Sequence, residues 1–468
     1  MAPIFANMSC DPFTGIDGQC IVGSYVPYAV NASSAADYAH TLAFAAESNI
    51  RLVIRNTGHD YMGKSTGAGA LALWTHHLKD ISILNYTSQS YTGPAMKMGA
   101  GVQASEAQAA ANAQGYVVVH GDCPTVGLAG GYTQGGGTSP LSSLFGLAVD
   151  QVLEWEAVTP SGELLVATPD QNPDLYWALT GGGGGTYAVV LSMTVKVHPN
   201  MITAGATLSF THNDTEVYWG IVQTFLMNLP ALLDAGGTSY WEVLPGNIFG
   251  APQTFLPNGT AEELESLLQP TLTALNESGI SYEFSSVDYP TFQDAFNTLN
   301  PDMTIQELNV GGRLIPRSLV ATDEASANLT SAIEYIINNN GLLAGVSLNV
   351  DRSTTSSNSA NPYWRETLFL AFFGIEYDQY DLSTNVAAQR NITNILTPAL
   401  EAITPNGAAY LNEADYNQPN WQDVFYGSNY ERLLSIKHEL DPSSVLWGKT
   451  AVGSEGWEIM SDGRLCKV

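Results

Sequence analysis

Hydrophobic runs of four to eight residues alternate with glycine-rich and polar segments over the first part of the chain. Apolar side chains spaced three and four apart predict an amphipathic helix over 33–49, with Ser33 or Ser34 as its N-cap. Continuous aliphatic runs predict strands, and an alanine-rich stretch predicts a second helix. The strands are predicted at 50–55, 71–74, 116–120, 151–158, 163–167 and within 180–197, and the second helix at 103–114.

From about residue 200 the hydrophobic segments become longer, and helical patterns alternate with strand patterns. This alternation favours an α+β unit in which an antiparallel sheet is backed by helices. We therefore expect three parts, 1–200, 201–424 and 425–468, the last packing back on the first. The later helices are predicted at 214–229, 261–275, 321–340, 385–404 and within 425–447, and the strands near 204–211, 238–245, 343–350 and 366–376.

The net charge of the chain argues against several kinds of binding partner. It has 468 residues with 16 Lys and Arg against 45 Asp and Glu, a formal net charge of −29. Such a charge argues against partners with phosphate backbones and against anionic membranes. No apolar run of about 18 residues predicts a membrane-spanning helix. Eight N-x-S/T sequons lead us to expect a secreted protein with N-linked glycans, at Asn7, Asn31, Asn85, Asn213, Asn258, Asn276, Asn328 and Asn391.

The four cysteines differ in their surroundings. Cys10 and Cys20 lie close together in a loop rich in Asp, Pro and Gly, where a disulfide is plausible for a secreted protein. Cys466, near the end, is expected to be a free thiol. Cys123 stands alone inside a glycine-rich segment, with no partner at a suitable spacing. Because the chain has no C-x-x-C pair, we expect no structural zinc site.

Three glycine-rich loops, 56–70, 121–137 and 180–186, each follow a predicted strand. Glycine lets the backbone approach a ligand closely, and successive backbone N–H groups in such loops bind anions. The alternative is that the loops are only tight turns. With seven glycines, 121–137 is expected to be irregular. The chain has no P-loop motif, and 181–186 is followed by a strand rather than by the helix of a Rossmann fold.

His59 lies in the middle of the first of these loops. A lone loop histidine is usually solvated or structural, and metal binding requires partners. His76 and His77 are adjacent to each other, and His120 and Cys123 show no convincing ligand spacing. We therefore expect no metal.

Four segments carry a family resemblance: RNTGHDYMG from Arg55, GDCPTVGLAGGYTQGGG from Gly121, GGGGGTYAVVLSMTVKV from Gly181, and FYGSNYERLLSIKHELDPSSVLW from Phe425. Over nearly the whole chain the sequence resembles the berberine bridge enzyme-like branch of the vanillyl-alcohol-oxidase flavoprotein family. It is most similar to secreted fungal members, such as those called isoamyl alcohol oxidases. The resemblance implies a two-part PCMH-type FAD-binding domain, a substrate domain, and a C-terminal segment returning to the FAD domain.

The resemblance also implies a covalent cofactor. Matched to the family motifs, His59 would bond the 8α-methyl group of FAD and Cys123 would bond flavin C6. The backbone of the 55–59 loop would hold the diphosphate. Other assigned cofactor contacts are Arg55, Asn56, Thr57, Gly58, Val126, Gly127, Gly130, Gly131, Gly135, Gly136, Gly137, Thr186, Tyr187, Val189 and Tyr430.

The acid–base residues follow from the same resemblance. The family's Y-x-N motif matches Tyr410 and Asn412, so Tyr410 is the expected base, although it is one tyrosine among 22 and core packing is the alternative. Tyr61 matches a second active-site tyrosine. A phenol base needs activation, because its usual pKa is about 10. The candidate activators are Lys64 and Arg365, and Glu413 and Asp415 are either alternative bases or solvent-facing groups.

The implied activity is an oxidase. Valine at position 126, three residues after the matched cysteine, is similar to family members that react with dioxygen, so hydrogen peroxide is the expected co-product. The substrate is expected to be an alcohol or an oligosaccharide hydroxyl, held by residues of 306–317, 361–370 and the Tyr240–Trp241 pair. A monomer is expected. Two alternatives stay open: an oxidative cyclase or pericyclase on the same flavin scaffold, and a non-enzymatic binding glycoprotein such as a lectin.

Overall fold

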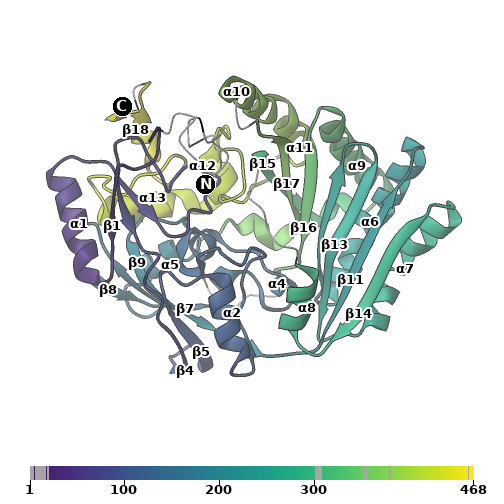
Figure 1. Ribbon diagram of the computed structural model, residues 1–468, viewed down its shortest axis with the longest axis horizontal. Coiled ribbons are helices and arrows are strands. Elements are labelled where there is room, and N and C mark those ends of the chain that lie inside the picture. The colour runs from purple at the N-terminus through teal and green to yellow at the C-terminus, as the bar shows by residue number, and fades with distance from the viewer. Residues whose placement is uncertain are drawn as a thin grey trace.

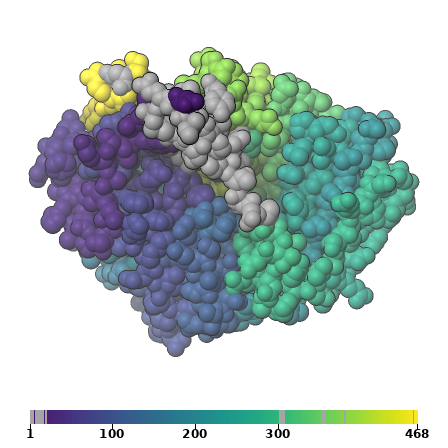
Figure 2. All heavy atoms as spheres, viewed as in Figure 1, coloured from purple at the N-terminus to yellow at the C-terminus, as the bar shows by residue number. Residues whose placement is uncertain are grey.

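The computed structural model describes Phe5, Asp17 and residues 21–300, 308–351, 357–378, 381–461 and 463–468. Two α+β halves lie side by side, with the C-terminal segment across the top of the first (Figure 1). In the lower part of the space-filling view, blue atoms of the first half lie directly against green and teal atoms of the second half (Figure 2). Cys10, Cys20 and the Asn7 sequon lie outside the described residues.

Within the described residues the first half contains three sheets, the smallest being the two-stranded pair of β6 (Tyr116–Val117) and β10 (His198–Pro199). A three-stranded parallel sheet is covered by the first helix, whose N-cap Ser34 accepts a hydrogen bond from Asp37 N and which buries Tyr38 and Leu42 as predicted. A five-stranded antiparallel sheet lies beside it. The parallel order is β1 (Tyr28–Asn31), β3 (Leu71–Trp74), β2 (Leu52–Arg55); the antiparallel order is β4 (Ile81–Thr87), β5 (Thr92–Gly99), β9 (Val189–Lys196), β7 (Val152–Val158), β8 (Leu164–Ala167); the helices are α1 (Ala35–Glu47), α2 (Ala104–Asn112) and α5 (Pro173–Leu179).

The second half is one seven-stranded antiparallel sheet. Three long helices cover the face turned away from the first half (Figure 1). Side chains alternate between the two faces, so Trp241 and Phe373 belong to the helix-covered core while their neighbours face the first half. The order is β14 (Tyr282–Tyr289), β11 (Thr203–Thr211), β13 (Ile248–Pro257), β12 (Thr238–Leu244), β16 (Leu342–Ser347), β17 (Thr367–Glu376), β15 (Leu308–Pro316), with helices α6 (Thr215–Asp234), α7 (Ala261–Glu277), α8 (Phe292–Leu299) and α9 (Asp323–Asn338).

Several elements differ from the sequence prediction. The strand expected at 116–120 is only β6 (Tyr116–Val117), and the helix expected at 385–404 is α10 (Leu382–Asn391), a π-helical turn and α11 (Thr397–Ile403). The glycine-rich 121–137 segment is not wholly irregular. It contains a π-helical turn, η2 (Leu128–Tyr132), and a short helix, α3 (Thr133–Gly135), because the segment is buried and its backbone groups must be paired internally.

The C-terminal segment packs on the first half through α13 (Tyr430–Leu440). Lys437 Nζ forms a buried ion pair with Asp441 Oδ2 at 2.6 Å and donates to the carbonyl of Thr186 at 2.8 Å. The Arg432 guanidinium lies 4.0 Å from the ring centre of Trp177 on α5. These contacts hold the 180–186 loop against the C-terminal segment. Cys466, on β19 (Leu465–Lys467), is a free thiol, and none of the helices in the described ranges combines the length and hydrophobicity needed to cross a membrane.

Candidate active site

A cavity of about 1110 Å³ lies between the two halves. The glycine loops after β2, before η2 and before β9 form one wall, and the exposed face of the seven-stranded sheet forms the other. Small-molecule cavities are usually about 300–1,000 Å³, so this one accommodates a cofactor together with a substrate.

His59 and Cys123 come together on the loop wall. Their Nε2 and Sγ atoms are 4.0 Å apart, although the residues are 64 positions apart in the chain. Thr125 Oγ1 lies between them, 2.6 Å from His59 Nε2 and 3.5 Å from Cys123 Sγ. Burial lowers the pKa of His59, which favours the neutral imidazole. The cavity wall therefore presents a neutral imidazole and a free thiol as neighbours.

The glycine loops pack backbone against backbone around this pair. A Cβ atom on Gly127 would collide with the side-chain amide of Asn56, which is held by a 2.5 Å hydrogen bond from its Nδ2 to the carbonyl of Ala100. A Cβ atom on Gly184 would lie 2.8 Å from Cα of Gly131. These glycines are required because no other residue permits such close approach.

Several buried polar atoms in the cavity wall have no hydrogen-bond partner among the described residues. They include side-chain oxygens of Asn56, Ser65, Asp122, Gln134 and Tyr240. Buried polar groups are normally paired, so unpaired ones around a cavity indicate a ligand with many hydrogen-bonding groups.

The assigned cofactor residues are distributed unevenly around the cavity. Gly135 to Gly137 lie behind the wall, where they approach Asn412 and Tyr410. Thr186 and Tyr187 are buried in the core, and the Tyr430 hydroxyl donates to Glu455 Oε1 at 2.7 Å, away from the cavity. Those that line the cavity are Arg55, Asn56, Thr57, Gly58, His59, Cys123, Val126, Gly127, Gly130, Gly131 and Val189.

Tyr410 and Asn412 also line the cavity, and both contact the 121–137 loop. The Tyr410 hydroxyl oxygen accepts hydrogen bonds from Asn412 Nδ2 at 2.9 Å and from the backbone N–H of Gly137 at 3.2 Å. Asn412 Nδ2 also donates to the carbonyl of Gly131 at 2.7 Å. Burial and the nearby Glu413 raise the pKa of Tyr410, while the two donors act in the opposite direction because they stabilise the phenolate.

Tyr61 lines the cavity as well, with its ring centre 5.6 Å from that of Phe372 on β17. Burial raises the pKa of Tyr61, so its hydroxyl stays protonated. The first half thus contributes a phenol side chain to the cavity lining.

Among the described residues, four carboxyl side chains line this cavity, those of Asp60, Asp122, Glu242 and Glu413, and sequence reasoning singled out only Glu413. Burial raises the pKa of Glu413 to about 7, with a further contribution from the charge of Asp122. Burial also raises the pKa of Asp122 to about 6. Asp415, by contrast, accepts hydrogen bonds from Gln389 and Thr393 and is a buried structural group. The solvent-facing interpretation is therefore wrong for Asp415, and the position of Asp122 immediately before Cys123 was the signal that was overlooked.

Neither candidate activator contacts Tyr410. The Arg365 guanidinium binds Asp150, with a shortest distance of 2.7 Å from NH2 to Oδ1. Lys64 lies in the cavity wall beside Gly448, and burial lowers its pKa to about 8 although Asp60 opposes that shift. In the part of the chain that the structure describes, the hydrogen bonds to the Tyr410 oxygen come from Asn412 and Gly137 alone.

The sheet wall is built from side chains that meet through strand pairing. Glu242 of β12 pairs in register with Ala344 of β16, which pairs with Phe372 of β17, and Tyr240 pairs with Val346. Trp241 points to the opposite face, into the core. Of the predicted substrate segments, Leu308 is the described residue of 306–317 in the wall; residues 361–370 are not in the wall, although Trp364 packs behind Tyr410.

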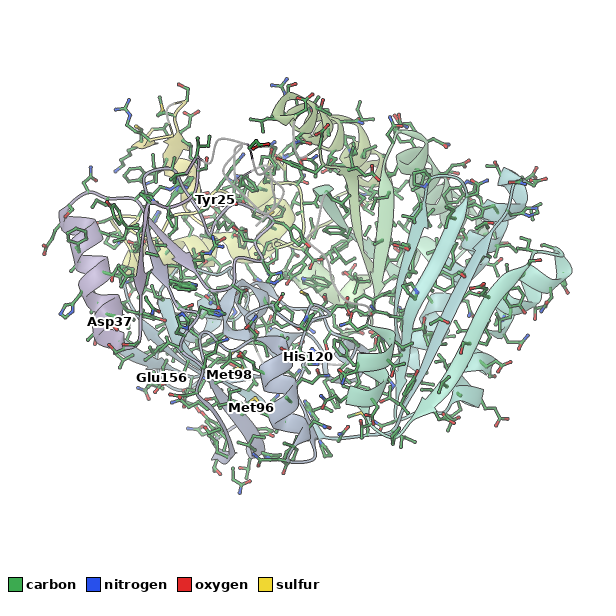
Figure 3. All side chains as sticks on the ribbon, in the orientation of Figure 1. Tyr25, Asp37, Met96, Met98, His120 and Glu156 are labelled. Carbon is green, nitrogen blue, oxygen red and sulfur yellow. The ribbon has the colours of Figure 1, made fainter. Side chains whose placement is uncertain are left out.

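The other histidines considered as metal ligands, His76, His77 and His120, have structural surroundings. His120, labelled in Figure 3, is buried with its ring centre 4.8 Å from that of Phe296 on α8, and burial lowers its pKa to about 4. His76 and His77 pack against Trp74. Within the described ranges, no three His, Cys, Asp or Glu side chains are arranged to hold a metal ion.

Replacing Glu413 with Gln is expected to change the pH dependence of stability. In the folded state this carboxyl keeps its proton up to about pH 7, whereas in the unfolded chain it ionises near 4.5. The free energy of unfolding of the wild type therefore falls as pH rises from about 4.5 to 7. One pKa unit corresponds to about 1.4 kcal/mol, and water in the cavity weakens the effect, so we expect Glu413→Gln to be about 1–2 kcal/mol more stable than wild type at pH 8.

Urea unfolding of the holoprotein at pH 5 and pH 8 measures this difference. At pH 5 the variant and the wild type are expected to be nearly equal. The exposed Glu431→Gln on α13 is the matched control and should show no pH-dependent difference. A Glu413→Gln variant that loses stability equally at both pH values would contradict a protonated Glu413.

Comparison with known proteins agrees with this architecture. Residues 26–168 match the family model described as FAD binding domain, and residues 409–453 match that described as berberine and berberine like. The chain is 49% identical over its full length to the FAD-linked oxidoreductase sor8 of Hypocrea jecorina, covering 82% of it, and 41% identical to the bifunctional decalin synthase calF of Penicillium decumbens, covering 83% of it.

Solved structures show the same fold. The crystal structure of the VAO-type flavoprotein MtVAO615 from Myceliophthora thermophila C1 superimposes with a TM-score of 0.94 at 43% identity, covering 99% of this chain and 86% of that one. The fold also resembles that of a xylooligosaccharide oxidase from the same organism, at 21% identity and a TM-score of 0.73, covering 91% of this chain and 92% of that one. The chain belongs to the berberine bridge enzyme-like branch of the vanillyl-alcohol-oxidase family and is an FAD-dependent oxidoreductase.

The cavity fits FAD. The close-packed glycine loops leave a groove along Arg55 to Gly58 and Gly127 to Gly131, and the unpaired oxygens of Asn56, Ser65 and Gln134 supply partners for a polar cofactor. A protein of net charge −29 can hold the diphosphate of FAD in this groove, because backbone N–H groups bind anions without a positively charged side chain.

Proposed function

We propose that this protein is an oxidase with FAD attached at both His59 and Cys123. It oxidises an alcohol or carbohydrate hydroxyl. The observation that carries the proposal is the 4.0 Å separation of His59 Nε2 and Cys123 Sγ in the wall of the cavity that Tyr410 and Asn412 also line. When bound, FAD supplies the hydride acceptor and passes the electrons to dioxygen, giving hydrogen peroxide.

The chain's own residues hold the substrate and move its proton. Tyr410 acts as the phenolate and accepts the hydroxyl proton of the substrate; hydrogen bonds from Asn412 Nδ2 and the N–H of Gly137 stabilise the phenolate before the transfer. Glu413 lies in the same turn and receives the proton in exchange with the cavity. Val126, in the loop wall, leaves room for dioxygen beside the cofactor.

The sheet wall determines the substrate. Tyr240 and Phe372 provide flat apolar surfaces, and Glu242 provides an acceptor for a hydroxyl group. This combination suits an aromatic alcohol or a sugar ring. We also propose that the protein is secreted, carries N-linked glycans and acts as a monomer, on the basis of its sequons and its sparse charge.

A second candidate is an oxidative cyclase on the same scaffold. It is favoured by the similarity to calF, whose name describes a decalin synthase, and by the enclosed sheet wall with Tyr240, Phe372 and Val346. An enclosed apolar wall suits a folded hydrocarbon chain as well as an aromatic ring.

Anaerobic bleaching of the flavin tests the proposal. The panel includes benzyl alcohol, isoamyl alcohol, xylobiose and cellobiose, with peroxide release measured on readmission of air. We expect at least one member to bleach the flavin completely and to yield peroxide in equal amount to the oxidised substrate. Bleaching without peroxide, or no bleaching by any hydroxyl donor while a polyene is cyclised, would favour the cyclase instead.

A further inference from the structure

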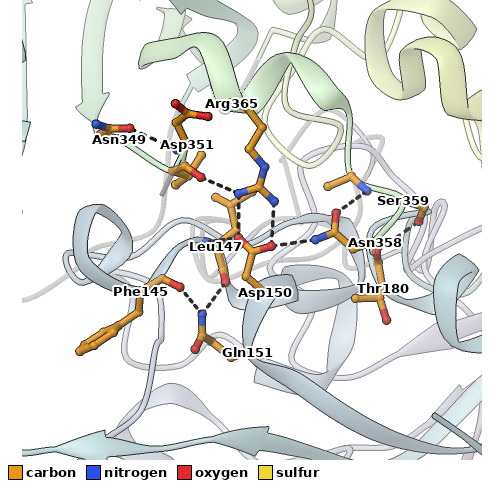
Figure 4. A network of polar contacts seen from close by, with 12 residues as sticks. Phe145, Leu147, Asp150, Gln151, Thr180, Asn349, Asp351, Asn358, Ser359 and Arg365 are labelled. Atoms are coloured by element: carbon orange, nitrogen blue, oxygen red, sulfur yellow. Dashed lines mark hydrogen bonds and ion pairs between the residues drawn. The ribbon is translucent and has the colours of Figure 1, made fainter. Parts of the chain in front are cut away.

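An ion pair between Asp150 and Arg365 joins the two halves (Figure 4). Asp150 lies in the short helix η3 (Ala148–Gln151) of the first half, and Arg365 lies in η5 (Pro362–Glu366) of the second. The guanidinium binds both carboxylate oxygens, with NH2 to Oδ1 at 2.7 Å and NH1 to Oδ2 at 3.0 Å. NH1 also donates to the carbonyl of Val350 at 2.7 Å. The Asp150 side chain is completely enclosed, whereas 28% of Arg365 is exposed.

The Asp150 carboxylate organises a tight turn. Oδ2 accepts a hydrogen bond from the backbone N–H of Leu147 at 2.9 Å, and Oδ1 accepts one from Asn358 Nδ2 at 2.7 Å. The other charged group nearby, the Lys196 ammonium, donates to the Asp150 backbone carbonyl at 3.2 Å. Donors from the two halves and the turn itself therefore converge on one buried carboxylate, which fixes the geometry of residues 147–150.

This turn holds the peptide that contacts Tyr410. Ala148 N donates to the carbonyl of Gly137 at 2.8 Å, and Val149 N donates to that of Gly136 at 3.0 Å. Gly136 and Gly137 have φ angles of +137° and +81°, which only glycine adopts without strain. Clamped in this way, the N–H of Gly137 points at the Tyr410 hydroxyl oxygen at 3.2 Å.

The ion pair also fixes the ring of Tyr410. Trp364, the residue before Arg365, packs edge-on against it with ring centres 5.4 Å apart and an interplanar angle of 73°. Trp364 is buried, so its position follows that of the η5 turn that Arg365 anchors. The ion pair thus positions both the Gly137 N–H that donates to Tyr410 and the Trp364 ring that packs against it.

We propose that Asp150 and Arg365 are positioning residues for the proton-accepting Tyr410: they hold the Gly137 N–H on its oxygen, so that the phenolate is stabilised by two fixed donors instead of one. This inference rests on the proposed function, in which Tyr410 is the base. Fixed donors stabilise a charge more than mobile ones, because they need no reorganisation when the charge forms. The titratable groups that face Tyr410 are Glu413 on its own segment and Tyr132 from η2, and the variants below leave both unchanged.

Arg365→Lys and Asp150→Asn in the full-length holoprotein test the inference. Lysine cannot bind both carboxylate oxygens, and asparagine keeps the shape of Asp150 without its charge. With the fastest substrate of the alcohol and oligosaccharide panel, we expect the rate constant of flavin reduction at neutral pH to fall about tenfold with KM within about twofold of wild type. The pH of half-maximal rate should move up by about one pH unit, so that the variants approach the wild-type rate at high pH.

A second readout needs no substrate. The near-ultraviolet tyrosinate absorbance of each protein, minus that of its Tyr410→Phe counterpart, follows the ionisation of Tyr410 directly. The pH midpoint of this absorbance change should be higher in Arg365→Lys than in the wild type. It should rise by less in Asn358→Ala, because that variant loses one hydrogen-bond donor to Asp150 and keeps the ion pair. The matched control is Arg317→Lys, in an ion pair with Asp234 at 2.8 Å that does not border the cavity.

The outcomes distinguish failure of the positioning role of Asp150 and Arg365 from failure of Tyr410 as the base. If the folded variants lose thermal stability but keep the wild-type pH profile and tyrosinate midpoint, the pair is only structural and the inference is overturned. If Arg365→Lys does not fold, Asn358→Ala and Asp150→Asn decide by the same two readouts. If Tyr410→Phe reduces its flavin at the wild-type rate, it is the proposed base that fails, whatever the ion-pair variants show.

Discussion

Replacing Tyr410 with Phe is expected to slow flavin reduction by about 10²–10⁴-fold, the usual contribution of a positioned general base. The substitution removes one oxygen atom and leaves the ring packed against Trp364. Without that oxygen the Gly137 N–H and one N–H of Asn412 point at a carbon atom, so the cavity has no fixed acceptor for the substrate proton at this position. Anaerobic stopped-flow spectroscopy of flavin bleaching measures the rate constant.

The matched control is Tyr426→Phe. The Tyr426 hydroxyl is buried and donates to the Thr450 carbonyl at 2.9 Å, but it lies outside the cavity wall, so its removal should affect stability and not the rate. Glu413→Gln, assayed beside it, distinguishes the two proton acceptors. A Tyr410→Phe rate within twofold of wild type, together with a large loss in Glu413→Gln, would transfer the role of base to the carboxyl group.

The fold was predictable wherever hydrophobic periodicity was strong. Helices α1, α6, α7 and α9 and strands β2, β3, β7, β8 and β9 lie where the pattern places them, whereas β1, β4, β5, β13 and β14 were not predicted. Strand β15 was missed because Gly311 and Gly312 interrupt its hydrophobic run. The structure explains this interruption: a Cβ atom on Gly312 would collide with the carbonyl of Glu413. Gly312 therefore weakens the strand pattern in the sequence and, in the structure, allows the 410–414 segment to approach the sheet.

The loop wall of the site was predictable because its residues lie in short local motifs. The sheet wall was not, because it depends on the register of strands that are distant in sequence. Glu242, Ala344 and Phe372 become neighbours only through pairing across about 130 positions. Likewise, Arg365 was predicted as an activator of the tyrosine, and it influences Tyr410 through Asp150 and Gly137 instead of by contact.

Only the double variant His59→Ala/Cys123→Ala is expected to release its flavin on denaturation. In each single variant one covalent bond remains, so acid precipitation should leave the flavin in the pellet. In the double variant the flavin should appear entirely in the supernatant, measured by its visible absorbance. Cys466→Ala is the matched control, because that thiol lies on β19, outside the cavity wall, and its loss should change nothing.

Two bonds to adjacent edges of one ring require that the imidazole and the thiol lie within a few ångströms of each other. The 4.0 Å separation of Nε2 and Sγ meets that requirement, and the lowered pKa of His59 leaves a ring nitrogen free of its proton for bond formation. Each proposed bond would withdraw electron density from the flavin, so each single variant should have a lower reduction potential and slower substrate oxidation. If Cys123→Ala alone released all its flavin, His59 would not be an attachment site. The shared wall would then hold the cofactor by one bond only.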